Sequence, residues 1–326
     1  GVGPGGRHGW DRVRALDRAP LASLFLAFVI FQKAAAKTMQ LTGSTFPYTR
    51  DRLPLARALA GIAAAGFEFV SLAREHAESA LFRDPGNSGA LDELREAIVS
   101  YGLQCRHANF GELTGDARST ADLREFIRAG SYLGIHNVSV LAPARFEAGE
   151  DNRRIPKDEK TMAADRKRLI AALRKLLPEA QNAGVVLTLA PRPGIALTGA
   201  ALGEIHGSLG SADFGVCYDP VQVHFHQGTD PVEDLAPVAG ATTALFATDH
   251  AGIPGRLRVV PPGSGELNLQ AVLAALVAAG FDGPVIAARL GVLGARRIDR
   301  EMQRAAEHLR AIGAQAEGRG AAATRS

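Results

Sequence analysis

Short apolar runs alternate with helical patterns along most of the chain. Runs of Val, Leu, Ile and Ala that lack a polar residue at every second position predict strands buried on both faces. We expect such strands at 40–44, 67–72, 104–107, 137–141, 185–189, 214–218, 243–247 and 285–288. Helical periodicity fills the gaps, at 55–65, 89–101, 120–133, 161–183, 198–208, 230–239, 268–279 and 299–312.

Glycine marks the ends of several predicted helices. Gly66, Gly102, Gly134, Gly184 and Gly280 each stand just past a helical pattern and before an apolar residue. The residue after a helix often takes a left-handed conformation, which glycine adopts without strain, and the next side chain then enters the core. This recurrence indicates one strand-then-helix unit repeated along the chain.

The repeated units predict an α/β fold, namely a (β/α)8 TIM barrel in a single domain spanning 39–312. Eight such units over about 270 residues agree with this barrel in number and size. An open doubly wound sheet is the alternative, and it would favour a glycine fingerprint for phosphate. The only candidate, 291–294, follows the last strand and lacks the GxGxxG pattern.

The two ends of the chain differ from this body. Residues 1–38 run from arginines through the apolar stretch Leu21–Phe31 to Ala34–Ala36, the layout of a secretory signal. We favour the alternative, a non-domain extension that is translated upstream sequence or an artefact, because a start at Met39 would yield a complete domain. The Gly-, Ala- and Arg-rich stretch 313–326 predicts a disordered tail.

Charge and composition exclude several functions. The net charge of +3 lies in the tails, with +4 in 1–38 and +1 in 313–326, which leaves the body at −2. We therefore expect no nucleic-acid partner. The longest apolar run, Leu21–Phe31, is too short to span a bilayer, so we expect no membrane partner. Cys105 and Cys217 form no CxxC pair, which fits a reducing compartment and a cytoplasmic location unless 1–38 is a genuine export signal.

A TIM barrel carries its chemistry at the C-terminal ends of its strands. The polar residues that the predicted strands place there are Glu75, His76, His107, Arg192, Asp219, His224, His226, Asp249, His250 and Arg289. Two long segments, 143–160 and 251–265, stand over the same end and predict lids.

The order of several motifs resembles the xylose-isomerase-like barrel superfamily of sugar and sugar-phosphate isomerases and epimerases. The resemblance covers residues 39 to about 312. It rests on the fragments 66–72, 183–189, 215–220, 228–231, 263–268 and 279–284. It implies a TIM barrel with one divalent Mn, Mg or Zn ion, held by a Glu after the fifth strand, an Asp after the sixth, a His after the seventh and a Glu after the eighth. Such a metal polarises sugar oxygens while the two Glu move a proton.

The chain departs from that pattern at most of these positions. Ala190 stands at the first Glu position, Phe246 at the His position, and Ala288 or Arg289 at the last Glu position. Asp219 is the one expected metal ligand that remains. Because a lone carboxylate holds a divalent ion weakly, we expect no cofactor to be bound in the family's manner. Arg192, two residues after Ala190, and Arg289 would instead attract an anion.

Candidate roles follow, each with a structural alternative. Asp219, Asp249, His250 and His107 are the candidates for proton transfer, and Arg192, Arg289, His224 and Glu266 are the candidates for substrate binding. Asp219 could be only a helix cap and His107 a core histidine. The two arginines could be ion-pair partners of Asp219, Asp249 or Glu266. His224 and His226 could form a relocated metal site with Asp219 or lie on the surface. Glu75 and His76 are most simply solvated loop residues.

Two functions remain open at this point. The first is an isomerase or epimerase that acts on a small sugar-like or keto-acid substrate by proton transfer, with a degenerate metal site. The second is a non-catalytic descendant that binds a small anionic ligand or a protein partner. The sequence also leaves a homo-oligomer open.

Overall fold

The computed structural model describes residues 39–76, 78–149, 154–156, 158–253, 256 and 258–323. The predictions for residues 1–38 and for the last three residues lie outside this range. All described elements belong to the compact unit that begins at Met39.

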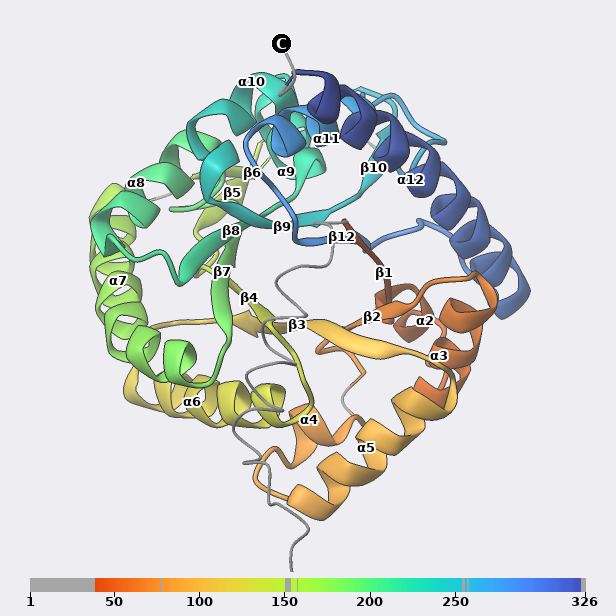
Figure 1. The fold of residues 1–326 in the computed structure, drawn as a ribbon. Coiled ribbons are helices and arrows are strands. Elements are labelled where there is room, and N and C mark those ends of the chain that lie inside the picture. The colour runs from red at the N-terminus through yellow and green to blue at the C-terminus, as the bar shows by residue number, and fades with distance from the viewer. Residues whose placement is uncertain are drawn as a thin grey trace, which may run out of the picture. The chain divides into compact units, whose positions relative to one another are not determined.

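Eight parallel strands close into a barrel (Figure 1). Their order around the barrel is β1-β12-β9-β8-β7-β4-β3-β2, and each strand pairs with its neighbours in parallel register. The strands are β1 Gln40–Ser44, β2 Phe69–Leu72, β3 Gln104–Glu112, β4 Asn137–Leu141, β7 Val186–Ala190, β8 Phe214–Tyr218, β9 Thr242–Phe246 and β12 Pro284–Ala287. The predicted TIM barrel is therefore confirmed.

Helices surround the barrel in chain order, as Figure 1 shows. They are α2 Phe46–Thr49, α3 Leu55–Ala64, α4 Ala80–Arg83, α5 Ser88–Ser100, α6 Ala117–Tyr132, α7 Glu159–Asn182, α8 Gly199–Leu209, α9 Pro220–Gln227, α10 Pro231–Leu235, the 3₁₀ helix η1 Ala236–Ala241, α11 Leu269–Ala278 and α12 Ala295–Ala323. The predicted helix 230–239 is thus split between α10 and η1. The glycines predicted to end helices have positive φ, for example 79° at Gly66 and 68° at Gly184.

The last helix is longer than expected. The sequence predicted its end at 312, whereas α12 continues to Ala323. The extra turns pack against the start of the barrel, since Ala316 is buried and the carboxylate of Glu317 accepts the backbone N–H of Met39 at 3.2 Å. These contacts with β1 hold in a helix a segment whose composition alone predicted disorder.

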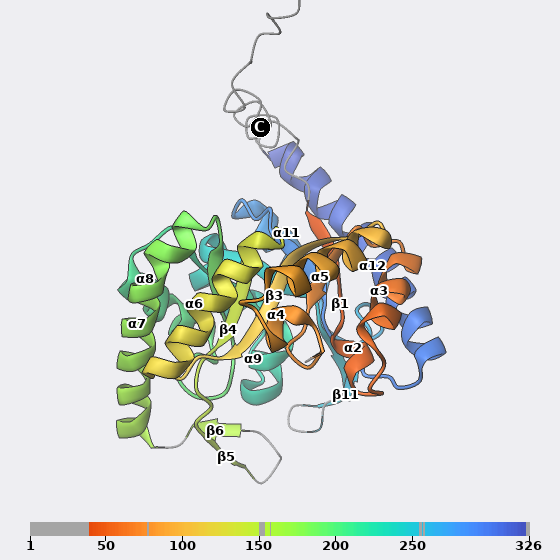
Figure 2. The same cartoon turned by 90° about the horizontal axis from the view of Figure 1, so that it is seen from below.

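Two small hairpins extend from the end of the barrel where the strands finish (Figure 2). One is β5 Phe146–Ala148 with β6 Arg154–Pro156, and the other is β10 Asp249–Ala251 with β11 Arg258–Val260. The first hairpin lies within 143–160 and the second overlaps 251–265, the two segments predicted as lids. Among the described helices, none is both long and apolar enough to cross a membrane.

Candidate functional site

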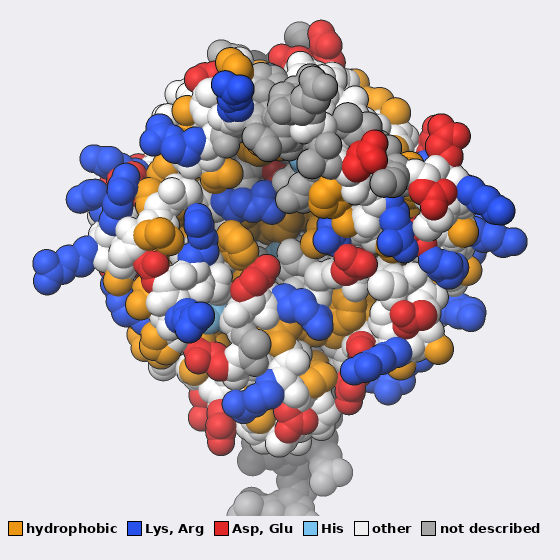
Figure 3. Space-filling view, turned by 180° about the vertical axis from the view of Figure 1, so that it is seen from behind, with side chains coloured by type: hydrophobic (Ala, Val, Ile, Leu, Met, Phe, Trp, Pro, Cys, Tyr) orange, Lys and Arg blue, Asp and Glu red, His pale blue; other side chains and the backbone are white. Residues whose placement is uncertain are grey.

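A cavity of about 590 Å³, partly open to solvent, lies at the C-terminal ends of the barrel strands. Figure 3 shows this face, on which basic and acidic side chains stand around a hollow with hydrophobic side chains in its floor. The lining residues come from segments that follow most of the strands: Ser44, Phe46, Ser71, Ala73, Glu75, Asn109, Leu141, Ala190, Pro191, Asp219, Phe246, Ala288 and Arg289. We call this cavity the mouth.

Four positions singled out by the family resemblance meet in the mouth. Ala190 ends β7, Asp219 follows β8, Phe246 ends β9 and Ala288 follows β12, and all four line the cavity. Three of these side chains are apolar. The barrel therefore brings together the residues at the expected ligand positions, but only one of them carries a ligating group.

The apolar members of this set form a small cluster inside the barrel, separate from the main core. Ala190, Phe246 and Ala288 pack there with Cys217, Ala244, Ile286 and Leu141. Burial, and then the charge of Asp219, raise the pKa of the Cys217 thiol well above its ordinary value. The floor of the mouth is thus apolar. A hydrated divalent cation that settled on it would lose water molecules without gaining protein ligands.

Asp219 is buried and fully engaged. It caps α9, since its Oδ1 accepts the backbone N–H of Val221 at 3.2 Å, and the same oxygen accepts the hydroxyl of Thr248. Its Oδ2 accepts from Nη1 of Arg289 at 3.2 Å. Asp219 is therefore both the helix cap and the ion-pair partner of Arg289 that the sequence suggested as alternatives. The guanidinium of Arg289 therefore neutralises the carboxylate at the point where the family resemblance would place a metal.

His107 lies beneath the mouth and does not line it. Its Nδ1 is 2.7 Å from Oγ of Ser71 and its Nε2 is 3.0 Å from Oγ of Ser139, while its ring meets Phe246 edge-on. Complete burial lowers the pKa of His107 from 6.5 to about 3. The ring is therefore neutral at ordinary pH. It orients the hydroxyl of Ser71, a residue that does line the mouth.

Glu75 is the candidate that sequence reasoning undervalued. It is exposed, it lines the mouth, and the structure gives its carboxylate no hydrogen-bond or ion-pair partner among the described residues. Its neighbour His76 behaves differently, because its ring is buried and Nε2 lies 3.0 Å from the backbone oxygen of Leu53. The position of Glu75 shortly after a strand pointed to the site. From the sequence alone, however, a carboxylate in the cavity could not be distinguished from one on a solvated loop.

Asp249 anchors the loop over the mouth. Its buried carboxylate accepts backbone N–H groups from His250 at 2.8 Å, Gly263 at 3.1 Å, Gly265 at 2.9 Å and Leu267 at 3.2 Å. Glu266 adds a similar contact, in which its Oε1 accepts the N–H of Gly252 at 3.1 Å. These contacts occupy both oxygens of Asp249 in holding the β10–β11 segment, and neither residue lines the mouth.

His224 and His250 stack on each other with ring centroids 4.8 Å apart. His250 is buried, and neither of its ring nitrogens has a partner among the described residues. Burial, and then the nearby His224, lower the pKa of His250. His226 is on the same helix as His224, but two residues along a helix point about 200° apart, so the two rings do not face one metal.

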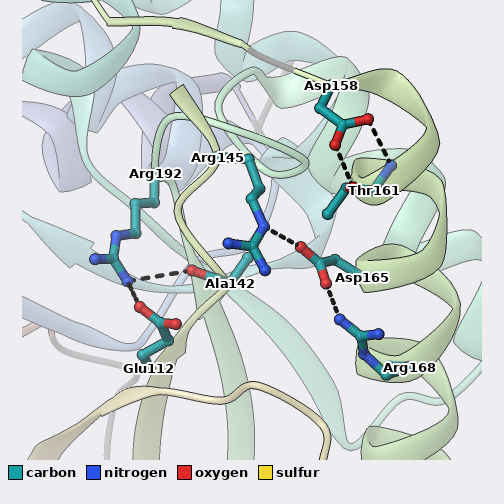
Figure 4. A network of polar contacts seen from close by, with 8 residues as sticks. All are labelled: Glu112, Ala142, Arg145, Asp158, Thr161, Asp165, Arg168 and Arg192. Atoms are coloured by element: carbon teal, nitrogen blue, oxygen red, sulfur yellow. Dashed lines mark hydrogen bonds and ion pairs between the residues drawn. The ribbon is translucent and has the colours of Figure 1, made fainter. Parts of the chain in front are cut away.

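Arg192 is not among the described residues that line the mouth, and Figure 4 shows its guanidinium directed toward Glu112. Its Nη1 donates to Glu112 at 2.6 Å and to the backbone oxygen of Ala142 at 3.3 Å. A neighbouring network lies further out, where Arg145 and Arg168 hold the buried carboxylate of Asp165 on α7. Arg192 thus forms an ion pair, but its partner is Glu112 and not Asp219, Asp249 or Glu266, the partners that the sequence suggested.

The residues at the mouth do not fit the metal that the family implies. Across the described residues, no group of three or more His, Cys, Asp or Glu side chains is arranged to hold a metal ion. Both oxygens of Asp219 already accept hydrogen bonds. The described residues of the mouth therefore lack the ligand set that a metal-dependent step would need.

The closed parallel barrel and the cavity at its strand ends define a TIM barrel whose site lies where TIM-barrel enzymes have theirs. The sequence profile of the Xylose isomerase-like TIM barrel family matches residues 59–312, and the chain belongs to this family. This confirms the resemblance seen in the motifs. No curated protein matches the chain in sequence.

Solved structures share the fold. A xylose isomerase domain protein from Alicyclobacillus acidocaldarius subsp. acidocaldarius is 18% identical with a TM-score of 0.66, covering 86% of this chain and 100% of that one. D-psicose 3-epimerase with D-tagatose from Clostridium cellulolyticum H10 is 14% identical with a TM-score of 0.66, covering 84% and 99%. The IOLI protein with a binding zinc atom is 17% identical with a TM-score of 0.68, covering 85% and 99%. At these identities the likeness shows the fold alone.

Proposed function

We propose that the mouth binds a small sugar-like or keto-acid ligand and that the protein isomerises it by proton transfer beside a carbonyl, without the family's metal cage. One observation carries the proposal. The same cavity is lined by a guanidinium fixed on a buried carboxylate, Arg289 on Asp219, and by the carboxylate of Glu75, which has no partner among the described residues. This pairs a positive group with a proton acceptor, the two requirements of such a step.

Arg289 supplies the positive group. A guanidinium has five N–H donors, and Asp219 accepts from one nitrogen of Arg289. The guanidinium also lies over the ring of Phe46, 6.0 Å from its centroid, which limits its orientation. The remaining donors can bind a ligand's carbonyl oxygen and stabilise the negative charge that develops on it when the adjacent carbon loses a proton.

Glu75 is the proposed base. It takes a proton from the carbon beside the carbonyl, and the electron pair of that C–H bond forms the enolate, whose oxygen Arg289 holds. The proton of the hydroxyl on that first carbon moves to the former carbonyl oxygen, and the electron pair of its O–H bond forms the new C=O bond. Glu75 then returns its proton to the former carbonyl carbon. Because the other carboxylate in the described lining, Asp219, is engaged, the proton returns on the face that it left, which favours isomerisation over epimerisation.

Ser44, Ser71 and Asn109 complete the described polar lining and suit the hydroxyl groups of a sugar. His107 positions Ser71 through the 2.7 Å contact, so its proposed role is indirect. Asp249 and Glu266 hold the overlying loop. The free, buried thiols of Cys105 and Cys217 support the further proposal that the protein works in a reducing compartment such as the cytoplasm.

Solvent exchange tests this function. A panel of aldoses, ketoses and short keto acids is incubated with the protein in D2O, and NMR follows deuterium entering at the carbon beside the carbonyl. We expect exchange with at least one member, a loss of about 100-fold in Glu75→Gln, and no change in Glu93→Gln, an exposed control on α5. Binding without exchange in the wild type would favour the non-catalytic alternative.

A further inference from the structure

A second cavity adjoins the mouth and shares two residues with it. This cavity, of about 560 Å³, is lined by Phe46, Pro47, Arg50, Val259, Arg289, Leu290, Gly291 and Val292. Phe46 and Arg289 also line the mouth, so the two cavities are neighbours that meet at these side chains. We call the second cavity the side pocket.

The charge of the side pocket has one sign. Its described lining contains the two arginines Arg50 and Arg289 and no carboxylate, and the other residues of that lining are apolar or glycine. Arg50 is exposed, and the structure gives its guanidinium no acidic partner among the described residues. Apolar walls exclude water and strengthen the attraction between such arginines and an anion.

The turn that carries Arg50 is held against the segment after β12. The carboxylate of Asp51 accepts the backbone N–H of Gly294, and the hydroxyl of Tyr48 donates to Asp299 of α12 at 3.1 Å. Arg57 pairs with the same carboxylate of Asp299. These contacts place Arg50 beside the loop of Arg289 before any ligand arrives, which reduces the entropy cost of binding.

We propose that the side pocket binds an anionic oxygen group, a phosphoryl or a carboxylate, through Arg50 and Arg289. Planar guanidinium groups make paired hydrogen bonds with such oxygens. If the anionic group belongs to the ligand whose sugar-like part lies in the mouth, the substrate is an anionic sugar or a sugar acid. This step rests on the proposed function. The anion site itself stands on the side pocket alone.

Inorganic phosphate and acetate are the probes, titrated into the full chain at constant ionic strength, with binding followed by calorimetry and by the melting temperature. We expect saturable binding of at least one of them in the wild type. Arg50→Gln should weaken that binding by about tenfold or more, since a charged hydrogen-bond donor is lost. Arg52→Gln is the matched control, because Arg52 lies two residues further on and lines neither cavity. Preference for phosphate over acetate indicates a phosphoryl group, and the reverse indicates a carboxylate.

Two results would overturn the site: neither anion binds saturably to the wild type, or Arg50→Gln binds as tightly as Arg52→Gln does. Each variant is checked for an unchanged circular dichroism spectrum, and Arg50→Lys keeps the charge as a second test that should restore part of the affinity. The outcome is separable from that of the deuterium exchange. Exchange of neutral sugars without anion binding would refute the side pocket only, while anion binding without exchange of any substrate would refute only the catalytic proposal.

Discussion

The guanidinium of Arg289 lies 3.2 Å from the buried carboxylate of Asp219, although the two residues are 70 positions apart in the chain. They follow β12 and β8, and between these strands lies β9, which ends in Phe246. An arginine, an aspartate and a phenylalanine thus share the space in which the family resemblance expects acidic and imidazole ligands. This relationship explains both the charge of the mouth and its poor fit to a metal.

The Arg289–Asp219 pair should contribute measurably to stability. Arg289→Gln leaves a buried carboxylate without its cation, and we expect a loss of about 1–3 kcal/mol in the free energy of unfolding. Urea denaturation of Arg289→Gln, Asp219→Asn and the double variant gives the coupling between the two residues. We expect a coupling of about 1–2 kcal/mol, and additive effects would show that the pair contributes nothing.

Asp249→Asn should loosen the loop over the mouth. The amide keeps one acceptor oxygen and loses the charge that attracts four backbone N–H groups, so we expect a cost of about 2–4 kcal/mol. Trypsin should also cut faster at the exposed Arg256 and Arg258. Glu266→Gln is the control, since it loses a single exposed contact and should cost less than about 1 kcal/mol. Equal effects of both variants would contradict this view of Asp249.

His107 should make stability fall in acid. Its pKa is about 3 in the folded protein and 6.5 in the unfolded chain, so between these values only the unfolded chain binds the proton. Lowering the pH from about 6.5 toward 3 therefore favours unfolding, by up to about 1.4 kcal/mol per pH unit from this residue. Above pH 6.5 the residue adds no pH dependence.

The difference in urea-unfolding free energy between the wild type and His107→Asn, measured across this pH range, isolates the effect of His107. His250, whose pKa is also lowered, contributes with the same sign to both proteins and cancels in the difference. The His107 ring proton signals in NMR should not titrate above pH 4. A titration midpoint near 6.5 would show that the ring is not buried as described.

Chelation should leave the protein unchanged. Asp219 is occupied by protein donors and its neighbours Ala190, Phe246 and Ala288 offer no ligand atoms. We expect EDTA not to lower the melting temperature, and Mn²⁺, Mg²⁺ or Zn²⁺ not to raise it beyond the effect of ionic strength. Metal analysis of the purified protein provides the direct measurement. Stoichiometric metal that disappears in Asp219→Ala would refute the proposed loss of the metal cage.

Local sequence patterns predicted most of the fold. The strands at 137–141 and 214–218 have the predicted bounds, because a buried parallel strand carries its signal in its own few residues. The extent of α12 beyond 312 could not be predicted, since it depends on contacts of Ala316 and Glu317 with the start of the barrel. Such contacts join residues that lie far apart in the chain.

The candidate site was predictable in place but not in detail. The rule that strand ends carry the chemistry located the mouth, and Asp219 and Arg289 are in it. It could not show that Arg192 turns toward Glu112, that His107 lies below the floor, or that Asp249 is surrounded by backbone N–H groups. The direction of each side chain depends on partners from other strands.

By itself, the sequence determined the repeated strand-and-helix order, the closed barrel that follows from it, and the loss of ligating side chains at three of the four expected positions, since each is a property of residue types at fixed spacings. Only the tertiary structure decided which charges meet. It joined Arg289 to Asp219, left Glu75 in the same cavity with no partner from the described part of the chain, and placed Arg50 beside a second cavity. The reason is physical: burial and pairing of a charge are set by neighbours that the chain brings together only when the barrel closes.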